Sequence, residues 1–235
     1  MSMILYKPRK KSTKKYGGIY NRFAAMDARG ICSTGWRLPT QADYSTLRAY
    51  VDPSGNDSSD YANIAGMHLK YAGIEYWNDP NTGADNSYNF NARSASIRDG
   101  DYTGEFSSIG YNAAYWTSSN LYGYPIAISL ANNSAILQVA GYSPTPNSGL
   151  SIRLVKTSLG IDEVLNDGQA ATPYIGNDGK TYQTVKIGLQ VWLAQNLRET
   201  KYTNGELIPL VEDNTSWILL MDGAMCYYNN DITNA

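Results

Sequence analysis

The side chains that could perform acid–base or nucleophilic chemistry are few in this chain. His68 is its single histidine, and it precedes Leu69 and Lys70 where a helix or strand is expected to end, so a structural role is favoured over that of a general base. The sequence contains no Gly-x-Ser-x-Gly elbow, no His-Glu-x-x-His motif and no Walker loop. Neither Cys32 nor Cys226 has metal-ligand spacing with His68. These observations predict a protein with no enzymatic activity and no zinc site.

Oxygen-bearing side chains between residues 77 and 86 could hold a hard cation. Calcium prefers carboxylate and amide oxygens. The candidate ligands are Asp79, Asn81, Asp85 and Asn86. The alternative is that these residues form simple Asx turns in a loop, and it is the favoured one. We therefore expect no cofactor, with calcium kept as a candidate.

Tyrosine is frequent, with 20 Tyr beside 21 Gly in 235 residues. Exposed aromatic rings with Asn and Ser neighbours suit sugar stacking or a protein partner. The predicted ligand-binding loop surface comprises Tyr102, Tyr111, Tyr122, Tyr124 and Tyr142. The alternative is that tyrosine fills strand positions, where it is also preferred, and we adopt that interpretation for Tyr115.

Residues 1–15 form a basic arm. It carries six of the 19 Lys and Arg residues and none of the 21 Asp and Glu, namely Lys7, Arg9, Lys10, Lys11, Lys14 and Lys15. Such an arm is expected to dock on the acidic surface of another protein. A membrane surface is an alternative partner, nucleic acid is not the expected one, and a solvated tail without a partner is the other alternative. No apolar run follows these charges and no stretch approaches about 18 apolar residues, so neither a secretory signal nor a membrane span is expected.

The segment from Gly35 to Leu47 gives the most specific local signal. Pro39 keeps the preceding residue extended, Thr40 can cap a helix, and Asp43 completes a Thr-x-x-Asp capping box. This pattern predicts a helix from the cap to about Val51. A second, short helix is predicted within residues 19–26, with Tyr20, Phe23 and Ala24 facing the core.

Short alternating segments predict a loop-rich protein with antiparallel strands. Strands are expected at residues 115–118, 126–130, 135–139 and 152–155, and a hairpin at 181–187 and 190–193 about Gly188-Leu189. Residues 73–112 are expected to form a long irregular excursion. Residues 157–173 break the strand pattern and are predicted to be a flexible linker with a helical turn near residues 161–165.

Several of these motifs, in order, resemble the Fibrobacter succinogenes major paralogous domain. They are Cys-x-x-Gly-Trp-Arg-Leu-Pro-Thr at 32–40, Ala-Gly-Met-His-Leu-Lys at 65–70, the Trp-Asn and Asn-Thr-Gly-Ala-Asp-Asn motifs within 77–86, Tyr-Trp-Thr-Ser-Ser at 115–119 and Ser-Ile-Arg-Leu-Val-Lys at 151–156. The family is thought to be related to the C-type lectin-like fold. The resemblance therefore implies an α+β, C-type lectin-like fold with short antiparallel strands, two helices and long irregular loops.

The two parts of the family pattern are in reversed order here. Residues 174–235 resemble the family's N-terminal part, and residues 16–156 resemble its C-terminal part. The resemblance implies a circularly permuted domain: an arm (1–15), the family's C-terminal part (16–156), a linker (157–173) and the family's N-terminal part (174–235) completing the same domain. Family members often carry cysteine at both matching places, which implies a Cys32–Cys226 disulfide. From the residues alone, two buried thiols are the alternative.

Neither part is expected to stand alone, because each would expose sheet edges and aromatic side chains. We expect the parts to close within one chain, with exchange between copies as the alternative. A homo-oligomer such as a trimer is also expected.

Three functions fit these observations. The first is a non-enzymatic virion protein of a bacteriophage, either a capsid decoration or a head or tail fibre. Its arm would dock to a capsid or other virion protein, and its tyrosine loops would bind a host-surface glycan or protein; an extracellular type of domain without an export signal suits a particle released by lysis. The second is a secreted or surface-anchored bacterial adhesion or carbohydrate-binding module. The third, a formylglycine-generating type of enzyme, is least expected. The resemblance implies that those relatives work through cysteines in their late loops, whereas Cys32 and Cys226 match the region where the fold closes.

Overall fold

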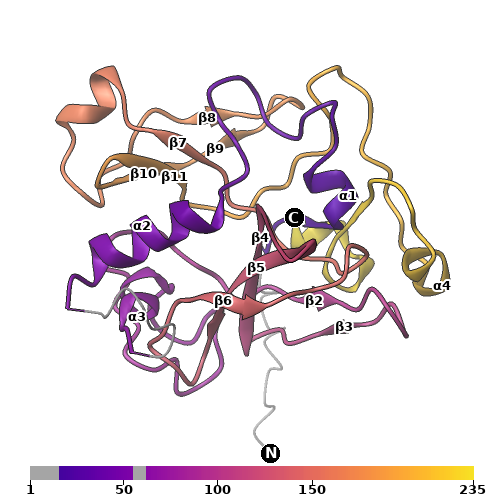
Figure 1. The fold of residues 1–235 in the computed structure, drawn as a ribbon, viewed down its shortest axis with the longest axis horizontal. Coiled ribbons are helices and arrows are strands. Elements are labelled where there is room, and N and C mark those ends of the chain that lie inside the picture. The colour runs from indigo at the N-terminus through magenta and orange to yellow at the C-terminus, as the bar shows by residue number, and fades with distance from the viewer. Residues whose placement is uncertain (1–15, 55–61) are drawn as a thin grey trace, which may run out of the picture.

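The computed structural model describes residues 16–54 and 62–235 and shows a mixed α+β protein built from short elements (Figure 1). Its helices are α1 (Arg22–Ala25), α2 (Gln41–Val51), α3 (Ala65–Leu69) and α4 (Asn214–Ile218), with 3₁₀ turns η1 (Gly160–Val164), η2 (Tyr228–Asn230) and η3 (Ile232–Asn234). Its strands are β1 (Ile19–Tyr20), β2 (Ile97–Arg98), β3 (Phe106–Ser107), β4 (Asn112–Leu121), β5 (Tyr124–Ala131), β6 (Gln138–Tyr142), β7 (Val155–Thr157), β8 (Tyr174–Ile175), β9 (Thr181–Tyr182), β10 (Thr184–Ile187), β11 (Gln190–Leu193) and β12 (Met225–Cys226). The described residues contain four α-helices where two were expected, because α3 and α4 are too short to leave a periodic pattern.

Helix α2 begins where the sequence predicts. The Asp43 N–H donates to Thr40 Oγ1 at 3.1 Å, and the Thr40 N–H donates to the Asp43 carboxylate at 2.7 Å, which completes the capping box. From this start, Tyr44 and Leu47 are buried, and the Tyr44 ring lies 4.8 Å from that of Trp192 between centroids. The predicted helix to Val51 is confirmed.

The first short helix is smaller than predicted. Ile19 and Tyr20 form β1, and α1 starts only after Asn21, whose Oδ1 accepts the Ala24 N–H at 2.9 Å. Phe23, expected in the core, is half-buried.

Strands β4, β5 and β6 form an antiparallel sheet in that order. β4 pairs with β5 from Asn112↔Ala131 to Leu121↔Tyr124, with a bulge in between, so the two predicted strands are confirmed and are longer than expected. The strand predicted at 135–139 lies instead at 138–142, because Asn63 holds Leu137: Oδ1 accepts the Leu137 N–H at 3.0 Å.

A second sheet has the order β10-β11-β7 and joins the two parts of the chain. The predicted hairpin about Gly188-Leu189 is confirmed, with β10 and β11 paired from Thr184↔Leu193 to Ile187↔Gln190. β7, three residues later than the strand predicted at 152–155, pairs with β11. Elsewhere β1 pairs with β12. Residues 16–156 and 174–235 therefore share two sheets within the same chain.

Both parts also contribute to the same hydrophobic clusters. In one cluster Tyr44 and Leu47 pack with Ile187 and Trp192. In the other, Tyr20, Trp116 and Leu150 pack with Tyr174, Tyr182 and Leu193. Burying these aromatic side chains is the largest favourable term available to such a fold, so the two parts stabilise each other.

The buried cation Arg153 connects the parts through hydrogen bonds. Its Nε donates to Asn196 Oδ1 at 2.8 Å, Nη1 donates to the carbonyl oxygens of Phe90 and Leu193 at 2.7 and 2.6 Å, and Nη2 donates to that of Asn91 at 2.7 Å. Burial lowers the pKa of Arg153 from its ordinary value. Five N–H groups in a planar fork allow one side chain to satisfy all of these acceptors.

The two ends of the described chain meet. The N–H groups of Tyr16 and Gly17 donate to the carbonyl oxygen of Asn234 at 2.8 and 3.3 Å. Asn196 Nδ2 also donates to the carbonyl oxygen of Tyr16 at 2.8 Å. Residue 16 therefore lies directly beside the C-terminal residues.

Residues 157–173, expected to be a flexible linker, are held on the sheet. The buried Asp162 carboxylate accepts from Lys156 Nζ at 2.7 Å and from the Thr172 N–H at 3.0 Å. The Gly168 N–H donates to the Lys186 carbonyl oxygen, so the segment runs along the edge of β10. The sequence pattern of this segment did not indicate these polar contacts.

A buried carboxylate pair in the C-terminal part, Glu199 and Asp178, contains one group whose pKa lies near neutral pH. Glu199 is fully buried, and its carboxylate accepts the N–H groups of Asn177 and Asp178 at 2.6 and 2.9 Å. Burial, and then the charge of Asp178, raise the pKa of Glu199 to about 7. For Asp178, hydrogen bonds from Lys180 and Thr200 outweigh burial and lower the pKa.

We predict that this pair makes stability depend on pH. The pKa of Glu199 is higher in the folded protein than its ordinary value of 4.5. The contribution of Glu199 to the free energy of unfolding is therefore fully present below pH 4.5 and is lost as the pH rises through about 7. The free energy of unfolding in urea is expected to fall by on the order of 2 kcal/mol between roughly pH 5 and pH 7.5. Asp178 titrates below this window. Glu199→Gln should flatten the slope, and an unchanged slope in that variant would assign it to another group.

Candidate functional site

The five predicted tyrosines lie at separate places on the molecule. Tyr102 is in the loop between β2 and β3, Tyr142 is on β6, and Tyr111 directly precedes β4. Tyr122 and Tyr124 are at the other end of β4, which is 10 residues long. At about 3.3 Å per residue, roughly 30 Å separate the two ends of this strand, so no single site holds all five.

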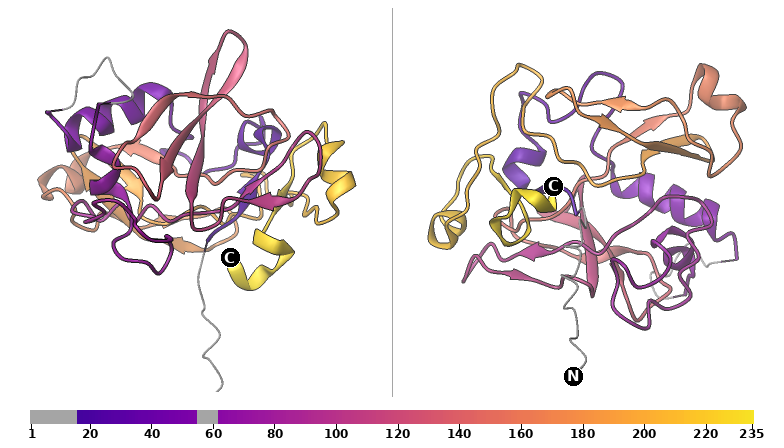
Figure 2. Two further views of the ribbon diagram at one scale, coloured as in Figure 1. Left: turned by 90° about the horizontal axis from the view of Figure 1, so that it is seen from below. Right: turned by 180° about the vertical axis from the view of Figure 1, so that it is seen from behind.

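The exposed turn that joins β4 to β5, residues 121–124, is the most prominent of these places; we call it the hairpin tip. Tyr122 is 92% exposed, Tyr124 69% and Leu121 50%. Tyr122 and Gly123 have φ values of 50° and 87°, the left-handed conformation that tight hairpin turns require. The tip stands out from the body of the molecule in the left panel of Figure 2. Its apolar side chains are therefore presented to solvent.

The base of the hairpin tip is held by partly buried hydrogen bonds. Arg22 Nη2 donates to the Ser119 carbonyl oxygen at 3.3 Å and to Asn120 Oδ1 at 3.0 Å. Burial lowers the pKa of Arg22 to about 10. On the other strand, Ser143 Oγ donates to the Pro125 carbonyl oxygen at 2.8 Å. The tip thus projects from a fixed base, which reduces the ordering cost of binding.

The hairpin tip is also electrically neutral. No Asp, Glu, Lys, Arg or His occurs between Glu105 and Arg153. Exposed aromatic and aliphatic side chains on a neutral protrusion are typical of recognition surfaces. The tyrosines of the tip were predicted, but Leu121 was not, and the long uncharged interval is the sequence signal that would have singled out the whole hairpin.

The other predicted tyrosines differ in exposure. Tyr102 is 85% exposed and Tyr111 56%. The loop that carries Tyr102 is ordered by Asp99, whose carboxylate accepts the N–H groups of Tyr102 and Thr103 at 3.1 and 2.5 Å. Burial opposes but does not offset these bonds, and the pKa of Asp99 is lowered to about 2.

Tyr142, predicted to lie on the ligand-binding loop surface, is on strand β6 and not in a loop. It pairs with Ala127 across the sheet and is half-buried against the cluster that contains Trp116. Burial raises its pKa. Its Gly and Ser neighbours suggested a loop, but the segment is an edge strand lying on the core.

The four calcium candidates serve different partners. Asn81 Nδ2 donates to the carbonyl oxygens of Tyr71 and Gly73, whereas Asn86 Oδ1 accepts the Asn91 N–H at 2.9 Å. Asp85 Oδ1 accepts the N–H of Ser87, two residues on, which is an Asx turn. Asp79 is exposed. Within residues 16–54 and 62–235, no three His, Cys, Asp or Glu side chains are grouped to hold a metal ion.

His68 lies beside an acid and a hydroxyl. Its Nδ1 is 2.9 Å from Asp85 Oδ2 and 3.0 Å from Ser87 Oγ. In a Ser-His-Asp triad the acid and the nucleophile engage opposite ring nitrogens, so that a proton can pass through the ring. Here both engage the same nitrogen, which fits a contact that holds the loop.

The predicted Cys32–Cys226 disulfide is absent, and both thiols are free. Cys32 Sγ donates to the Trp36 carbonyl oxygen at 3.2 Å, whereas Cys226 is buried with Ile19 and Trp217 in another cluster. Burial raises the pKa of Cys32 to about 11 and that of Cys226 to about 12. The resemblance located both cysteines near the join between the two parts, but β12 places Cys226 against β1.

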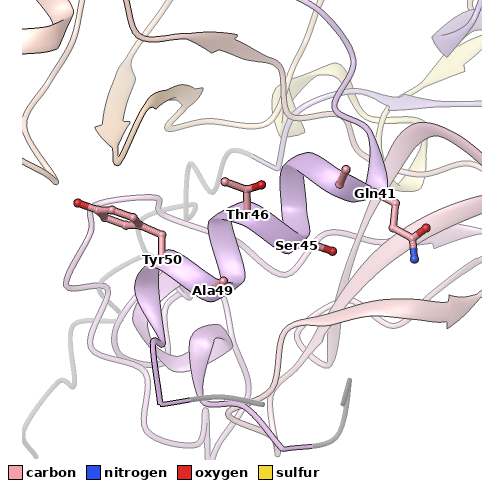
Figure 3. Close-up of a pocket in the computed structure, with 6 residues that line it drawn as sticks. Gln41, Ser45, Thr46, Ala49 and Tyr50 are labelled. Atoms are coloured by element: carbon pink, nitrogen blue, oxygen red, sulfur yellow. The ribbon is translucent and has the colours of Figure 1, made fainter. Parts of the chain in front are cut away.

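A hollow of about 810 Å³ runs along α2 (Figure 3). Its walls come from this helix alone: Gln41, Ala42, Ser45, Thr46, Ala49 and Tyr50. The Tyr50 hydroxyl donates to Asp167 at 2.7 Å, which raises its pKa. With no second element to enclose a ligand, this is an open helix face.

The predicted docking residues Lys7, Arg9, Lys10, Lys11, Lys14 and Lys15 lie outside the described residues. In the part of the chain that the structure describes, no helix has the length and apolar character needed to cross a membrane.

Comparison with known proteins gives one result. Residues 1–156 match the family described as the Fibrobacter succinogenes major domain. Neither the curated proteins nor the solved structures provided a match.

Proposed function

This chain belongs to the Fibrobacter succinogenes major domain family, and from that premise we propose that it is a non-enzymatic binding protein that recognises a cell surface through its hairpin tip. We also propose that its α+β fold is C-type lectin-like, with the family's two parts in permuted order. The sheets and clusters shared by residues 16–156 and 174–235, and the contact of Tyr16 with Asn234, support the permutation.

The observation that carries the binding proposal is the exposure of Leu121, Tyr122 and Tyr124 on a neutral protrusion whose base is hydrogen-bonded. Burying one such aromatic ring in an interface is among the largest single contributions to affinity. Because the tip is uncharged, its binding should depend little on salt. A glycan or a protein on the host surface is the partner that such a tip suits.

The proposed setting is the surface of a bacteriophage particle, as a capsid decoration or a head or tail fibre. The basic arm, residues 1–15, would dock the protein to an acidic surface of a capsid or other virion protein. A homo-oligomer such as a trimer would present several tips at once and convert weak contacts into strong attachment.

The second candidate is a secreted or surface-anchored bacterial adhesion or carbohydrate-binding module. The hairpin tip supports this function equally well, so the two candidates are distinguished by where the protein is found. Mass spectrometry of purified virions should detect the chain in stoichiometric amounts. Its absence from virions and presence in a bacterial envelope fraction would overturn the viral setting and leave the binding role in place.

An enzyme of the formylglycine-generating type is the least supported candidate. That chemistry needs reactive thiols, and a thiol reacts as the thiolate. Because burial raises the pKa values of Cys32 and Cys226 to about 11 and 12, both are protonated at neutral pH. The single-nitrogen contact of His68 provides no acid–base relay either.

We predict that the double substitution Tyr122→Ser, Tyr124→Ser weakens binding of the fluorescently labelled protein to a panel of bacterial cells. Removal of two exposed rings from an interface should cost at least about tenfold in affinity and leave the fold unchanged. Tyr111→Ser is the matched control, since that ring is exposed at the far end of β4. Equal binding by the parent and the double variant would contradict the proposal.

A further inference from the structure

A pocket of about 340 Å³ opens where the two parts of the chain meet at the β2–β3 hairpin; we call it the junction pocket. It is lined by Glu105, Phe106, Asn214, Asn229 and Asn230. The first two residues belong to the part 16–156 and the other three to 174–235. Figure 1 shows the β2–β3 turn beside α4. The pocket therefore forms only when the parts have closed on each other.

The walls of the junction pocket are held by Arg98, which is fully buried. Its Nη2 donates to Asn214 Oδ1 at 3.1 Å, and its guanidinium lies 4.9 Å from the centre of the Phe106 ring and 4.3 Å from that of Trp217. On the other side, Asn230 Nδ2 donates to the Glu212 carbonyl oxygen at 2.7 Å. The aromatic wall and two of the three amides are thus fixed before any ligand arrives.

The remaining polar groups of the pocket are available to a ligand. Because Arg98 occupies Oδ1 of Asn214, the Nδ2 group of this amide is left as a donor. The Glu105 carboxylate and the Asn229 amide are exposed and make no side-chain hydrogen bond within the described part of the chain. A ligand would meet a donor, an amide that both donates and accepts, and a charged acceptor around one aromatic ring.

This combination matches the chemistry of a sugar. A sugar ring has an apolar C–H face that packs on an aromatic ring and hydroxyl groups that both donate and accept hydrogen bonds. The volume is at the small end of the roughly 300–1,000 Å³ of ligand sites, which suits a single sugar residue. Glu105 is the only charged side chain among the five lining residues, so it would repel acidic sugars.

We propose that the junction pocket binds one neutral sugar residue of a surface glycan, with Phe106 as the stacking platform and with Glu105, Asn214 and Asn229 as the hydroxyl partners. The proposal rests on the cell-surface binding function above and adds to it a second contact, away from the hairpin tip, with a defined ligand class.

The backbone at the pocket provides a discriminating variant. Asn229 and Asn230 both have a φ of 52°, a left-handed conformation that costs a residue with a Cβ about 1–2 kcal/mol and costs glycine little. Asn229→Gly therefore removes the amide from the pocket while relieving strain. A purely structural asparagine would lose stability on this change, whereas a binding asparagine loses affinity and keeps stability.

The test uses the full chain on an array of neutral, N-acetylated and sialylated oligosaccharides, followed by calorimetric titration with the neutral oligosaccharide that gives the strongest signal. The parent should bind neutral glycans in preference to sialylated ones. Glu105→Gln and Asn229→Gly should each weaken binding about tenfold, the loss expected for one hydrogen bond to a ligand, with melting temperatures at or above that of the parent. The matched controls are Glu163→Gln, on η1, and Asn89→Gly, whose φ is 53°; both should bind like the parent.

Binding of the parent to no glycan, or equal affinity of the parent and both pocket variants, would overturn the junction pocket as a sugar site. In either case, loss of cell binding by the hairpin-tip double variant would leave the proposed function standing. Conversely, sugar affinity lost by the pocket variants and kept by the hairpin-tip variant supports the pocket, even where the tip proves irrelevant to cell attachment.

Discussion

Replacing Arg153 with methionine is expected to lower the free energy of unfolding by about 3–5 kcal/mol, a large share of the roughly 5–15 kcal/mol that stabilises a typical domain. The substitution leaves four buried acceptors without a donor: Asn196 Oδ1 and the carbonyl oxygens of Phe90, Asn91 and Leu193. Each buried unsatisfied acceptor costs about 1–3 kcal/mol, partly relieved by relaxation. Because the acceptors come from both parts of the chain, the loss should weaken their association.

Urea unfolding followed by tryptophan fluorescence measures this effect. Arg37→Met is the control, because the Arg37 side chain is half-exposed and pairs with Asp43 at the surface, where an ion pair contributes less than about 1 kcal/mol. Arg153→Lys keeps the charge but has no planar fork, so an intermediate loss is expected. An unfolding free energy of Arg153→Met within 1 kcal/mol of the parent, as for a surface pair, would show that these hydrogen bonds do not hold the two parts together.

The elements that could be predicted from the sequence are those whose determining contacts are local. The capping box of α2 needs only Thr40 and Asp43, three residues apart, and both its hydrogen bonds form. The β10–β11 hairpin needs only its turn and two alternating flanks. In such cases the types and spacing of neighbouring residues determine the element, so the sequence pattern is sufficient to predict it.

The contacts that could not be predicted join residues far apart in the chain, and many of them use backbone carbonyl oxygens, which every residue has. Arg153 lies between Ile152 and Leu154 in an apolar segment. Nothing in that segment indicates that the backbone carbonyl oxygens of residues 90, 91 and 193 accept hydrogen bonds from its guanidinium. The prediction of a Cys32–Cys226 disulfide failed for a related reason. The motif order indicated that both cysteines lie near the join, but strand register decides which atoms meet, and β12 pairs Cys226 with Ile19.

The candidate site shows the same division. Composition singled out Tyr122 and Tyr124, and both are exposed because they lie in or beside a short turn between two strands. It grouped them with Tyr142, whose burial depends on how β6 packs on the sheet. The junction pocket left no local pattern at all, since Glu105 and Asn229 come from opposite parts of the chain.

Deleting residues 174–235 is expected to abolish folding. The remaining chain would lose the partner strands of β1 and β7 and the buried rings of Trp192 and Trp217. Arg98 and Arg153 would each lose acceptors as well. An insoluble product with no cooperative unfolding is expected, because exposed strand edges and aromatic surface promote aggregation. Solubility and circular dichroism measure the outcome, and a stable, soluble monomer of residues 1–173 would contradict the shared core.

The matched control keeps residues 16–235, omits the arm (1–15) and reverses the order of the two parts. It runs from residue 166 to 235, through a connection of about four glycine and serine residues, and then from 16 to 165. The new junction is short because the Tyr16 N–H already donates to the Asn234 carbonyl oxygen at 2.8 Å, and the new ends lie in an exposed turn after η1. This chain should fold as a soluble protein with an unfolding free energy within about 2 kcal/mol of the parent, since cuts at exposed turns are tolerated. If it aggregates like the deletion, the ends do not meet in solution; if it folds while the deletion does not, the contacts between the two parts, and not their order, determine this fold.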